Sequence, residues 1–308
     1  FSTVFWFWEH REQHHWKMNQ VYRSIGTSKQ NVHQRFNRFL ALQEEKAQLE
    51  KIIHQVRQDH PDMGALSMYP LIRPRHMGRD RFIRWYREGG FTLYQRKNYH
   101  RTTDSSGVTR FENLLQQIEL TGVNQAYSSD ITYYQIDGQA YYLTFILDLY
   151  SRKVKGYRAS RSLVTEDTTI PALQMALKAE GGAVPDGLIF HSDGGGQYYS
   201  KGFLKITKKA NILNSMCRSV YENPHAERLN GVIKNKYLKH YNPVNFTQLK
   251  SQLKRAVEMY NCQKPHEALG GIPPETFEHQ IKVKQTPNKK TFKQINNQPL
   301  KTVNLNQY

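Results

Sequence analysis

The chain has 308 residues, a hydrophobic content of 38% and a formal net charge of +18 at neutral pH. A charge of this size favours a polyanionic partner, and DNA or RNA is favoured over an anionic membrane because no basic helix carries a wide apolar face. The two distant cysteines, Cys217 and Cys262, argue against a disulfide framework and a structural zinc site, and no apolar stretch is long enough to cross a membrane.

The start of the chain is apolar but lacks the features of a signal peptide. FSTVFWFW is short and is followed by acid and histidine instead of a small-residue cleavage site. Because Met18 is a plausible natural start, residues 1–17 are set apart as non-native or disordered sequence.

Residues 18–101 are expected to form a helical, helix-turn-helix DNA-binding region. Two helices within 20–45 are separated by GTSKQ, where Thr27 or Ser28 is a natural N-cap, and another helix is predicted at 43–59. A second helix pair spans LSMYPLIRPRHMGRDRFIRWYREGGF and ends at Gly89-Gly90. The alternative to DNA binding, for both helix pairs, is a helical hairpin with a solvent-exposed basic face. The residues predicted to contact DNA here are Lys29, Gln30, Arg35, Arg79, Arg81 and Arg84.

The middle of the chain is predicted to be a mixed α/β domain. Residues 102–124 form a polar linker with a short helix in FENLLQQIEL, and the α/β region follows at 125–241. The order β-β-β-α-β-α-β-α predicts an antiparallel meander that continues as parallel strands with crossover helices. The strands are expected at 126–136, 140–150, 152–160, 187–192 and 211–216, and the helices at 165–179, 200–210 and 223–241.

The last part of the chain is expected to be a helical extension followed by a disordered tail. Residues 242–280 form a C-terminal helical extension, with a helix at 246–261 and a turn at GGIPPETF. Residues 281–308 are rich in Lys, Asn and Gln and are expected to be a basic disordered tail.

Three acids fall at informative positions in the α/β region. Asp130 lies mid-strand, where a charge is costly unless it is paired or metal-bound. Asp193 ends the strand GLIFHS, and ligands gather at the carboxyl ends of strands in open α/β sheets. Glu227 falls in the first turn of a helix with Asn223 as N-cap and Pro224 at its first position. Three hard oxygen ligands select Mg²⁺ or Mn²⁺, and two such ions about 4 Å apart can promote displacement at a phosphodiester.

DITYYQIDGQAYYLTFILDLYSRKVKGY, HSDGGGQYYS and ENPHAERLNGVIKN, in this order, resemble the catalytic core of IS3-family insertion-sequence transposases. This family belongs to the DDE transposase and retroviral integrase superfamily. The resemblance covers about residues 20–276, including the closing YNCQKPHEALGGIPPETF. It implies a ribonuclease H-like, mixed five-stranded sheet with flanking helices, and a catalytic, metal-binding triad of Asp130, Asp193 and Glu227 with two Mg²⁺ ions, or Mn²⁺. Lys234 matches the family's basic residue after the glutamate, and Lys236 on the same helix is also expected to contact DNA.

Some assignments leave alternatives open. Only 33 residues lie between Asp193 and Glu227, two fewer than the family usually has, so Glu222 is a rival third ligand. Asp148, at the end of the second strand, is interpreted as a structural residue that bonds the turn. His191 orients Asp193, contacts DNA, or is a packed strand-end histidine. Positions 227, 231 and 234 share one face of an α-helix, which would place Lys234 near phosphate.

The resemblance implies a DNA transposase that catalyses metal-dependent 3′-end cleavage and strand transfer at insertion-sequence ends. Its partners would be the terminal inverted repeats, target DNA and further copies of the chain in a dimer or higher multimer, in the bacterial cytoplasm at the nucleoid. The alternatives are a ribonuclease H-like metal-dependent nuclease without strand transfer, and an inactive DNA-binding remnant. The basic two-part N-terminal region argues against the nuclease, and the intact triad argues against the remnant.

Overall fold

The computed structural model describes residues 2–92, 111–182, 184–217 and 222–285. The chain divides into two compact units. The helical unit comprises Phe1–Thr103 and Val232–Asn242, and the sheet unit comprises Asp104–Gly231 and Pro243–Tyr308. Residues 102–110 of the predicted linker and 286–308 of the predicted tail lie outside the described residues.

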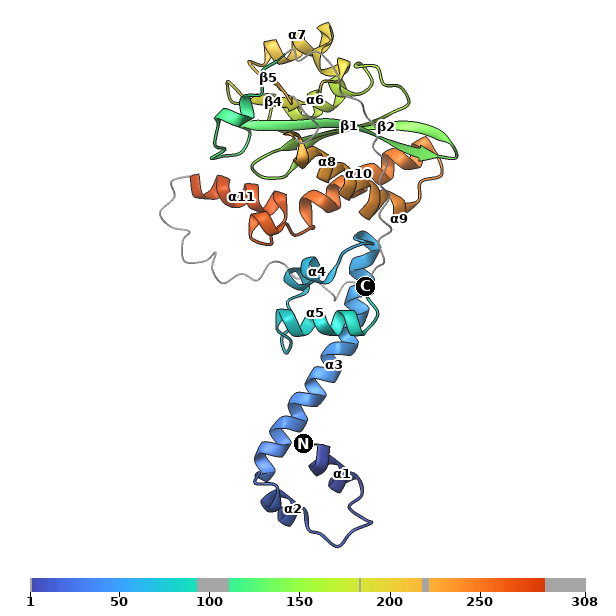
Figure 1. The fold of residues 1–308 in the computed structure, drawn as a ribbon, viewed down its shortest axis with the longest axis vertical. Helices are drawn as coiled ribbons and strands as arrows, with labels where there is room; N and C mark the ends of the chain where they lie inside the picture. The colour runs from blue at the N-terminus through green and yellow to red at the C-terminus, as the bar shows by residue number, and fades with distance from the viewer. Residues whose placement is uncertain (1, 93–110, 183, 218–221, 286–308) are drawn as a thin grey trace. The chain divides into compact units, whose positions relative to one another are not determined.

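The helical unit is built on one long helix (Figure 1). It contains α1 (Ser2–Glu9), α2 (Met18–Ser24), α3 (Lys29–Asp59), α4 (Ala65–Ile72) and α5 (Arg79–Glu88). The Ser28 hydroxyl accepts a hydrogen bond from the Asn31 N–H at 3.1 Å, so Ser28 is the N-cap of α3. The two helices predicted within 20–45 are present as α2 and the start of α3, but the prediction of a separate helix at 43–59 was wrong, because α3 continues to Asp59 without a break. The strong helix formers of ALQEEKAQLE, with no Gly or Pro, explain this continuity.

Residues that the sequence set apart at the start of the chain form α1 in the structure. Its Phe5 ring stacks on Phe36 of α3 with 5.9 Å between the ring centroids, and the Trp8 ring lies 6.4 Å from the same ring. Aromatic contacts therefore connect α1 to the first half of α3.

The second helix pair packs against the C-terminal half of α3. The Tyr86 hydroxyl donates to the Met63 carbonyl at 2.9 Å and accepts from Arg57 at 2.8 Å. A returning segment, the π-helix η4 (Val232–Leu238) with α9 (Lys239–Tyr241), adds a bond between the Tyr237 hydroxyl and His60 Nδ1 at 2.9 Å. The buried core of this unit consists of Leu42, Leu49, Ile53, Met63, Met68, Met77, Phe82 and Tyr86.

The sheet unit has a five-stranded sheet in the order β3-β2-β1-β4-β5. Its strands are β1 (Ala126–Ile136), β2 (Gln139–Asp148), β3 (Val154–Ser160), β4 (Ile189–Ser192) and β5 (Leu213–Met216). β1, β2 and β3 pair antiparallel, whereas β4 pairs in parallel with both β1 and β5. Asp137 and Gly138 both have positive φ, 48° and 80°, as a type I′ hairpin turn requires. The predicted element order and the ribonuclease H-like mixed sheet are confirmed.

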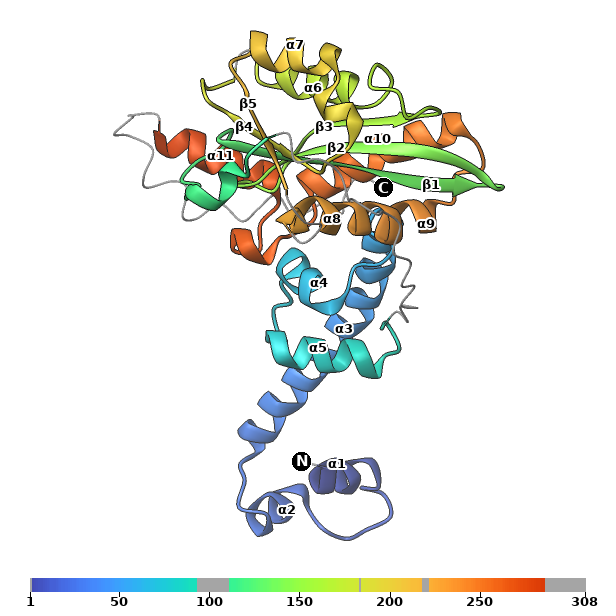
Figure 2. The same ribbon diagram turned by 45° about the horizontal axis from the view of Figure 1, so that its top comes forward.

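Helices cover both faces of this sheet (Figures 1 and 2). α6 (Thr169–Ala179) and α7 (Lys201–Lys209) lie on one face, and α8 (Pro224–Gly231) and α10 (Phe246–Cys262) lie on the other. The core under α6 and α7 includes Tyr127, Ile146, Leu173, Phe190 and Phe203. Short 3₁₀ turns are η1 (Leu114–Gln117), η2 (Gly196–Tyr199) and η5 (Glu267–Leu269).

A buried ionic network attaches α11 (Pro274–Gln285) to the sheet. Lys155 on β3, with a side chain only 1% exposed, contacts Glu180 and Glu278 at 2.7 Å each. Glu278 is on α11, so this helix is held by charge that would be costly to leave unpaired. The turn predicted at GGIPPETF, residues 270–277, is too long by four residues, because α11 starts at Pro274. Proline is a favoured first residue of a helix. α11 also extends five residues past the predicted boundary at 280.

Among the described residues, no helix has both the length and the apolar character needed for a membrane span.

We expect Gly156→Ala to destabilise the chain by about 3 kcal/mol, as measured by urea unfolding. A Cβ at Gly156 would lie 2.1 Å from the Ala172 carbonyl oxygen of α6, which is backbone and cannot move aside. Gly122→Ala is the matched control, because its Cβ would make only ordinary contacts beyond 3.7 Å. Equal unfolding midpoints for the two variants would show that α6 does not approach β3 this closely.

Candidate active site and nucleic-acid interface

Asp130 lies on the face of β1 that α8 covers. Asn230 of α8 donates from Nδ2 to Asp130 Oδ2 at 2.6 Å. Two residues earlier on the same face, the Ser128 hydroxyl donates to Asn223, which directly precedes α8. Ser129, between them, bonds to Tyr198 on the other face at 2.9 Å. Successive residues of β1 therefore point to opposite faces of the sheet, as the pleat of a strand requires.

Strand register places Asp193 beside Asp130. The parallel pairing of β1 and β4 ends with Ser129 opposite Ser192, and each of these residues is followed by an aspartate. The Gly195 N–H donates to Asp193 Oδ1 at 3.1 Å. A Cβ at Gly195 would lie 3.0 Å from this oxygen, so glycine lets the loop fold onto the carboxylate. Burial raises the pKa of Asp193, while the Gly195 N–H acts in the opposite direction.

The charges of Asp130 and Asp193 both affect the pKa values of two neighbouring residues, Cys217 and Tyr198. Burial raises the pKa of Cys217 to about 11, and Asp193, Glu222 and Asp130 add to this rise. Burial also raises the pKa of Tyr198, and the negative charges of Asp193 and Asp130 act in the same direction. Asp130 and Asp193 therefore contribute negative potential to the same small region.

Glu227 is on α8 but does not join the two aspartates in the structure. Its N–H donates to the Asn223 carbonyl at 3.3 Å in the first helical turn, and its side chain is exposed. It lies four residues after Asn223 and three before Asn230, spacings at which helical side chains are neighbours. Among the described side chains, no three His, Cys, Asp or Glu residues are close enough to hold a metal ion. Glu227 would have to turn toward Asp130 to complete a triad.

The rival residues all have structural contacts. Glu222 accepts hydrogen bonds from Asn113 at 2.8 Å and Gln116 at 3.3 Å, which fasten the η1 segment. Asp148 is fully buried and accepts three backbone N–H bonds, from Asn124, Tyr150 and Ser151, at 2.6–2.9 Å. The path shortened between Asp193 and Glu227 includes residues 218–221, which lie outside the described residues.

His191 is a packed strand residue. It is fully buried, and its Nδ1 bonds to the Ser215 hydroxyl of β5 at 2.9 Å. Burial lowers the pKa of His191, and Glu222 acts against this shift. Of its three interpretations, the packed strand-end histidine fits these contacts.

The donor atoms around Asp130 fit a hard divalent cation. Carboxylate and amide oxygens are the ligands that Mg²⁺ and Mn²⁺ prefer. Asn230 Oδ1 is buried, lies on the amide that bonds Asp130, and has no hydrogen-bond partner among the described residues. Asn230 was not among the predicted site residues. Its position three residues after Glu227 on a predicted helix was the available signal.

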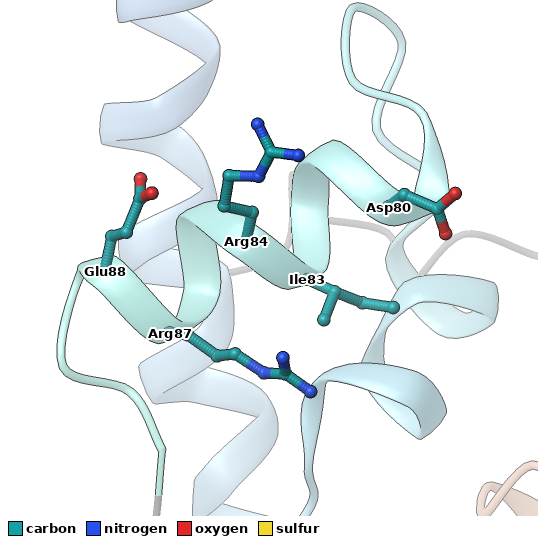
Figure 3. Close-up of a pocket in the computed structure, with 5 residues that line it drawn as sticks. All are labelled: Asp80, Ile83, Arg84, Arg87 and Glu88. Carbon is teal, nitrogen blue, oxygen red and sulfur yellow. The ribbon is translucent and has the colours of Figure 1, made fainter.

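The basic residues predicted to contact DNA are mostly exposed. Lys29, Gln30 and Arg35 are exposed at the start of α3, and Arg79, Arg81 and Arg84 are exposed on α5. A shallow depression of about 340 Å³ on α5 is lined by Asp80, Ile83, Arg84, Arg87 and Glu88. In Figure 3, Arg84 and Arg87 extend to opposite sides of the helix.

The two lysines after Glu227 belong to the helical unit. Lys236 forms an ion pair with Asp62 at 3.6 Å. Lys234 is half-buried within the π-helix η4. The prediction that positions 227, 231 and 234 share one face holds for an α-helix. From Val232 the helix has i→i+5 bonding, which changes the angle between successive side chains around the helix axis.

Comparison with known proteins identifies several relatives. The integrase core domain family matches residues 121–221, and a second integrase core domain family matches residues 209–274. A 31 kDa protein of insertion element IS600 from Shigella sonnei is 34% identical over 206 residues, which cover 65% of this chain and 75% of that protein. The transposase InsF of insertion sequence IS3fB from Escherichia coli is 33% identical over 178 residues, which cover 56% of this chain and 61% of InsF.

Solved structures of viral integrases are also similar. The HTLV-2 integrase catalytic core domain in complex with magnesium aligns with a TM-score of 0.42 and 23% identity, covering 51% of this chain and 97% of that domain. A chain of the simian T-cell lymphotropic virus intasome aligns with a TM-score of 0.44 and 18% identity, covering 59% of this chain and 60% of that chain.

We expect Asp193→Asn to raise the thermal unfolding midpoint of the metal-free chain at pH 7. Burial raises the pKa of Asp193 above its unfolded value of about 3.9, so its contribution to stability is present below that pH and is lost as pH rises through the folded pKa. The advantage of the variant should therefore shrink as pH falls from 7 toward 4.5. Thermal unfolding in EDTA measures this difference. Asp137→Asn at the exposed hairpin tip should change nothing, and an Asp193→Asn midpoint at or below wild type at pH 7 would contradict the expectation.

Proposed function

The chain belongs to the IS3 family of insertion-sequence transposases, and from this we propose that it cuts DNA at the 3′ ends of its element and joins those ends to target DNA. The observation that carries the proposal is the register of β1 against β4, which sets Asp130 and Asp193 side by side at the carboxyl ends of their strand pairing. The chain spans 61% of InsF, so the activity of the whole protein is part of the proposal.

Asp130, Asp193 and Glu227 are the proposed ligands of two divalent ions, Mg²⁺ or Mn²⁺. When bound, such ions supply Lewis acidity at the attacked phosphodiester and activate the attacking oxygen. Asn230 holds the Asp130 carboxylate in position, and the Gly195 N–H holds that of Asp193. Two carboxylates fixed on neighbouring strands form a preorganised site.

Glu227 is preferred to Glu222 as the third acid. Both oxygens of Glu222 already accept hydrogen bonds from the η1 segment, whereas Glu227 is exposed and lies between two helix positions that contact β1. Removing Glu222 from its partners would leave buried Asn113 unsatisfied, which costs free energy. Turning the exposed Glu227 side chain breaks no hydrogen bond that the structure records.

The helical unit is proposed to bind the terminal inverted repeats. Its second helix pair has a connection of six residues, 73–78, and α5 presents arginines on its exposed side while Phe82 and Tyr86 face the core. A helix of this kind can lie in the major groove of DNA. The proposed assembly on DNA is a dimer or higher multimer, since two element ends must be joined.

Replacement of a metal ligand tests the chemistry. Asp130→Asn should reduce Mg²⁺-dependent joining by about three orders of magnitude, since a metal Lewis acid contributes several kcal/mol and each 1.36 kcal/mol is tenfold in rate. The assay follows labelled duplex carrying the terminal repeat of the element into joined products on a sequencing gel, with EDTA as the blank.

Binding of the same duplex should be unchanged in Asp130→Asn, and Glu222→Gln is the matched carboxylate control that should retain joining. Metal-dependent joining by Asp130→Asn at the wild-type rate would refute the triad. Nicks without joined products from wild type would identify a nuclease instead.

The DNA-binding role of α5 is tested by salt dependence. The double variant Arg81→Gln/Arg84→Gln should bind terminal-repeat duplex more weakly, and the slope of log K against log salt should fall by about 2, one for each lost phosphate contact. Lys51→Gln, an exposed charge change on α3, should leave the slope unchanged. Fluorescence anisotropy measures both quantities, and equal slopes for all three proteins would exclude α5 from the interface.

A further inference from the structure

A cluster of basic groups lies in the sheet unit on the α8 and α10 side. Arg152 is in the turn after β2, and His225 and Arg228 are on α8. Lys264 and His266 follow α10. These residues come from three segments that are far apart in the sequence.

Contacts around the end of α10 bring these segments together. The Asn261 side chain accepts from the Val154 N–H and donates to the Val154 carbonyl, both at 2.9 Å, so the turn containing Arg152 lies against the end of α10. The neighbouring residue, buried Tyr260, packs its ring edge-on against His266 with 4.8 Å between the ring centroids. The Tyr260 hydroxyl lies within the electrostatic influence of both Arg152 and Arg228.

Two nitrogen atoms in this cluster are buried. Within the part of the chain that the structure describes, Arg152 Nη1 and His266 Nε2 have no hydrogen-bond partner. An unsatisfied buried donor costs free energy, and more so when it is part of a charged group. The acidic neighbour that acts on Arg152 is Asp148, whose carboxylate is already used by three backbone N–H groups.

The basic groups also act on each other. Burial lowers the pKa of His266 to about 3, and Lys264, Arg228 and Arg152 contribute to this shift. Burial likewise lowers the pKa of Arg152, opposed by Tyr260 and Asp148 and assisted by Arg228. A bound anion would offset this mutual repulsion.

We propose that Arg152, Arg228 and His266 form a binding site for a phosphate of the DNA backbone. Paired guanidinium groups match the geometry of phosphate oxygens, and contacts of this kind set the position of a DNA strand without reading its sequence. The site rests on the proposed function, because Arg228 directly follows Glu227 and shares α8 with Asn230, which bonds Asp130. The phosphate site would hold a DNA strand next to the part of α8 that lies beside Asp130 and Asp193.

Duplex binding by the full chain tests the site. Arg152→Gln and Arg228→Gln should each weaken binding of a fluorescein-labelled terminal-repeat duplex by about 10-fold, and should each reduce the salt slope by about 1. Arg158→Gln is the matched control, an exposed arginine on β3 whose strand partner Thr144 is outside this cluster. Arg228 is exposed, so its variant should retain the wild-type thermal midpoint even if Arg152→Gln is destabilised.

Histidine NMR with inorganic phosphate separates a free anion from a DNA phosphate. The His266 ring signals should shift on titration with inorganic phosphate and with the duplex in wild type, and both shifts should be lost in Arg228→Gln. Shifts with inorganic phosphate alone, with unchanged duplex affinity in both variants, would mean that the site takes a free anion and that the proposal is wrong. Unchanged affinity, slope and His266 signals would also overturn it.

The two proposals fail in different ways. If wild type joins DNA ends while Arg152→Gln and Arg228→Gln bind duplex as tightly as wild type, only the phosphate site is refuted. If wild type neither binds the duplex nor joins ends, the transposase function is refuted, and the absence of any His266 shift with duplex refutes the DNA-phosphate site as well.

Discussion

β1 and β4 pair in parallel over four residues, from Ala126 against Ile189 to Ser129 against Ser192, and the next residue on each strand is an aspartate. This pairing is the constraint on which the candidate site depends. A shift of register by one residue would turn Asp130 to the opposite face of the sheet, away from α8. The buried aromatic core under α6 and α7, with Phe190 and Tyr127 on the two strands, holds the register in place.

α8 is the second determinant of the site, and its contacts with β1 are polar. Asn223 bonds Ser128 and the Ser129 carbonyl, and Asn230 bonds Asp130. These bonds orient the helix along the strand and place Glu227 between them. The Glu227 side chain is exposed, whereas the carboxylates of Asp130 and Asp193 are partly buried. Three carboxylates repel one another, so Glu227 would join the two aspartates only when a bound cation offsets this repulsion.

The end of α10 and the segment after it make contacts that stabilise the sheet, and they also position residues of the proposed phosphate site. Lys155 and Glu278 hold α11, Asn261 holds β3, and the same end of α10 brings His266 toward Arg152 and Arg228. The proposed phosphate site thus depends on packing that also stabilises the sheet.

The sequence by itself determined the order of strands and helices and the placement of the three acids on these elements, because these follow from local periodicity and capping residues. It did not determine that α3 is one continuous helix, that Pro274 starts α11, or that the helix after Gly231 changes to π geometry, because local patterns define element ends poorly. Tertiary structure alone decided that Glu222 and Asp148 are occupied by backbone and amide donors, that Asn230 bonds Asp130, and that the turn with Arg152 and the ring of His266 both lie against the end of α10. Each of these depends on contacts between residues distant in the chain, which no local pattern contains.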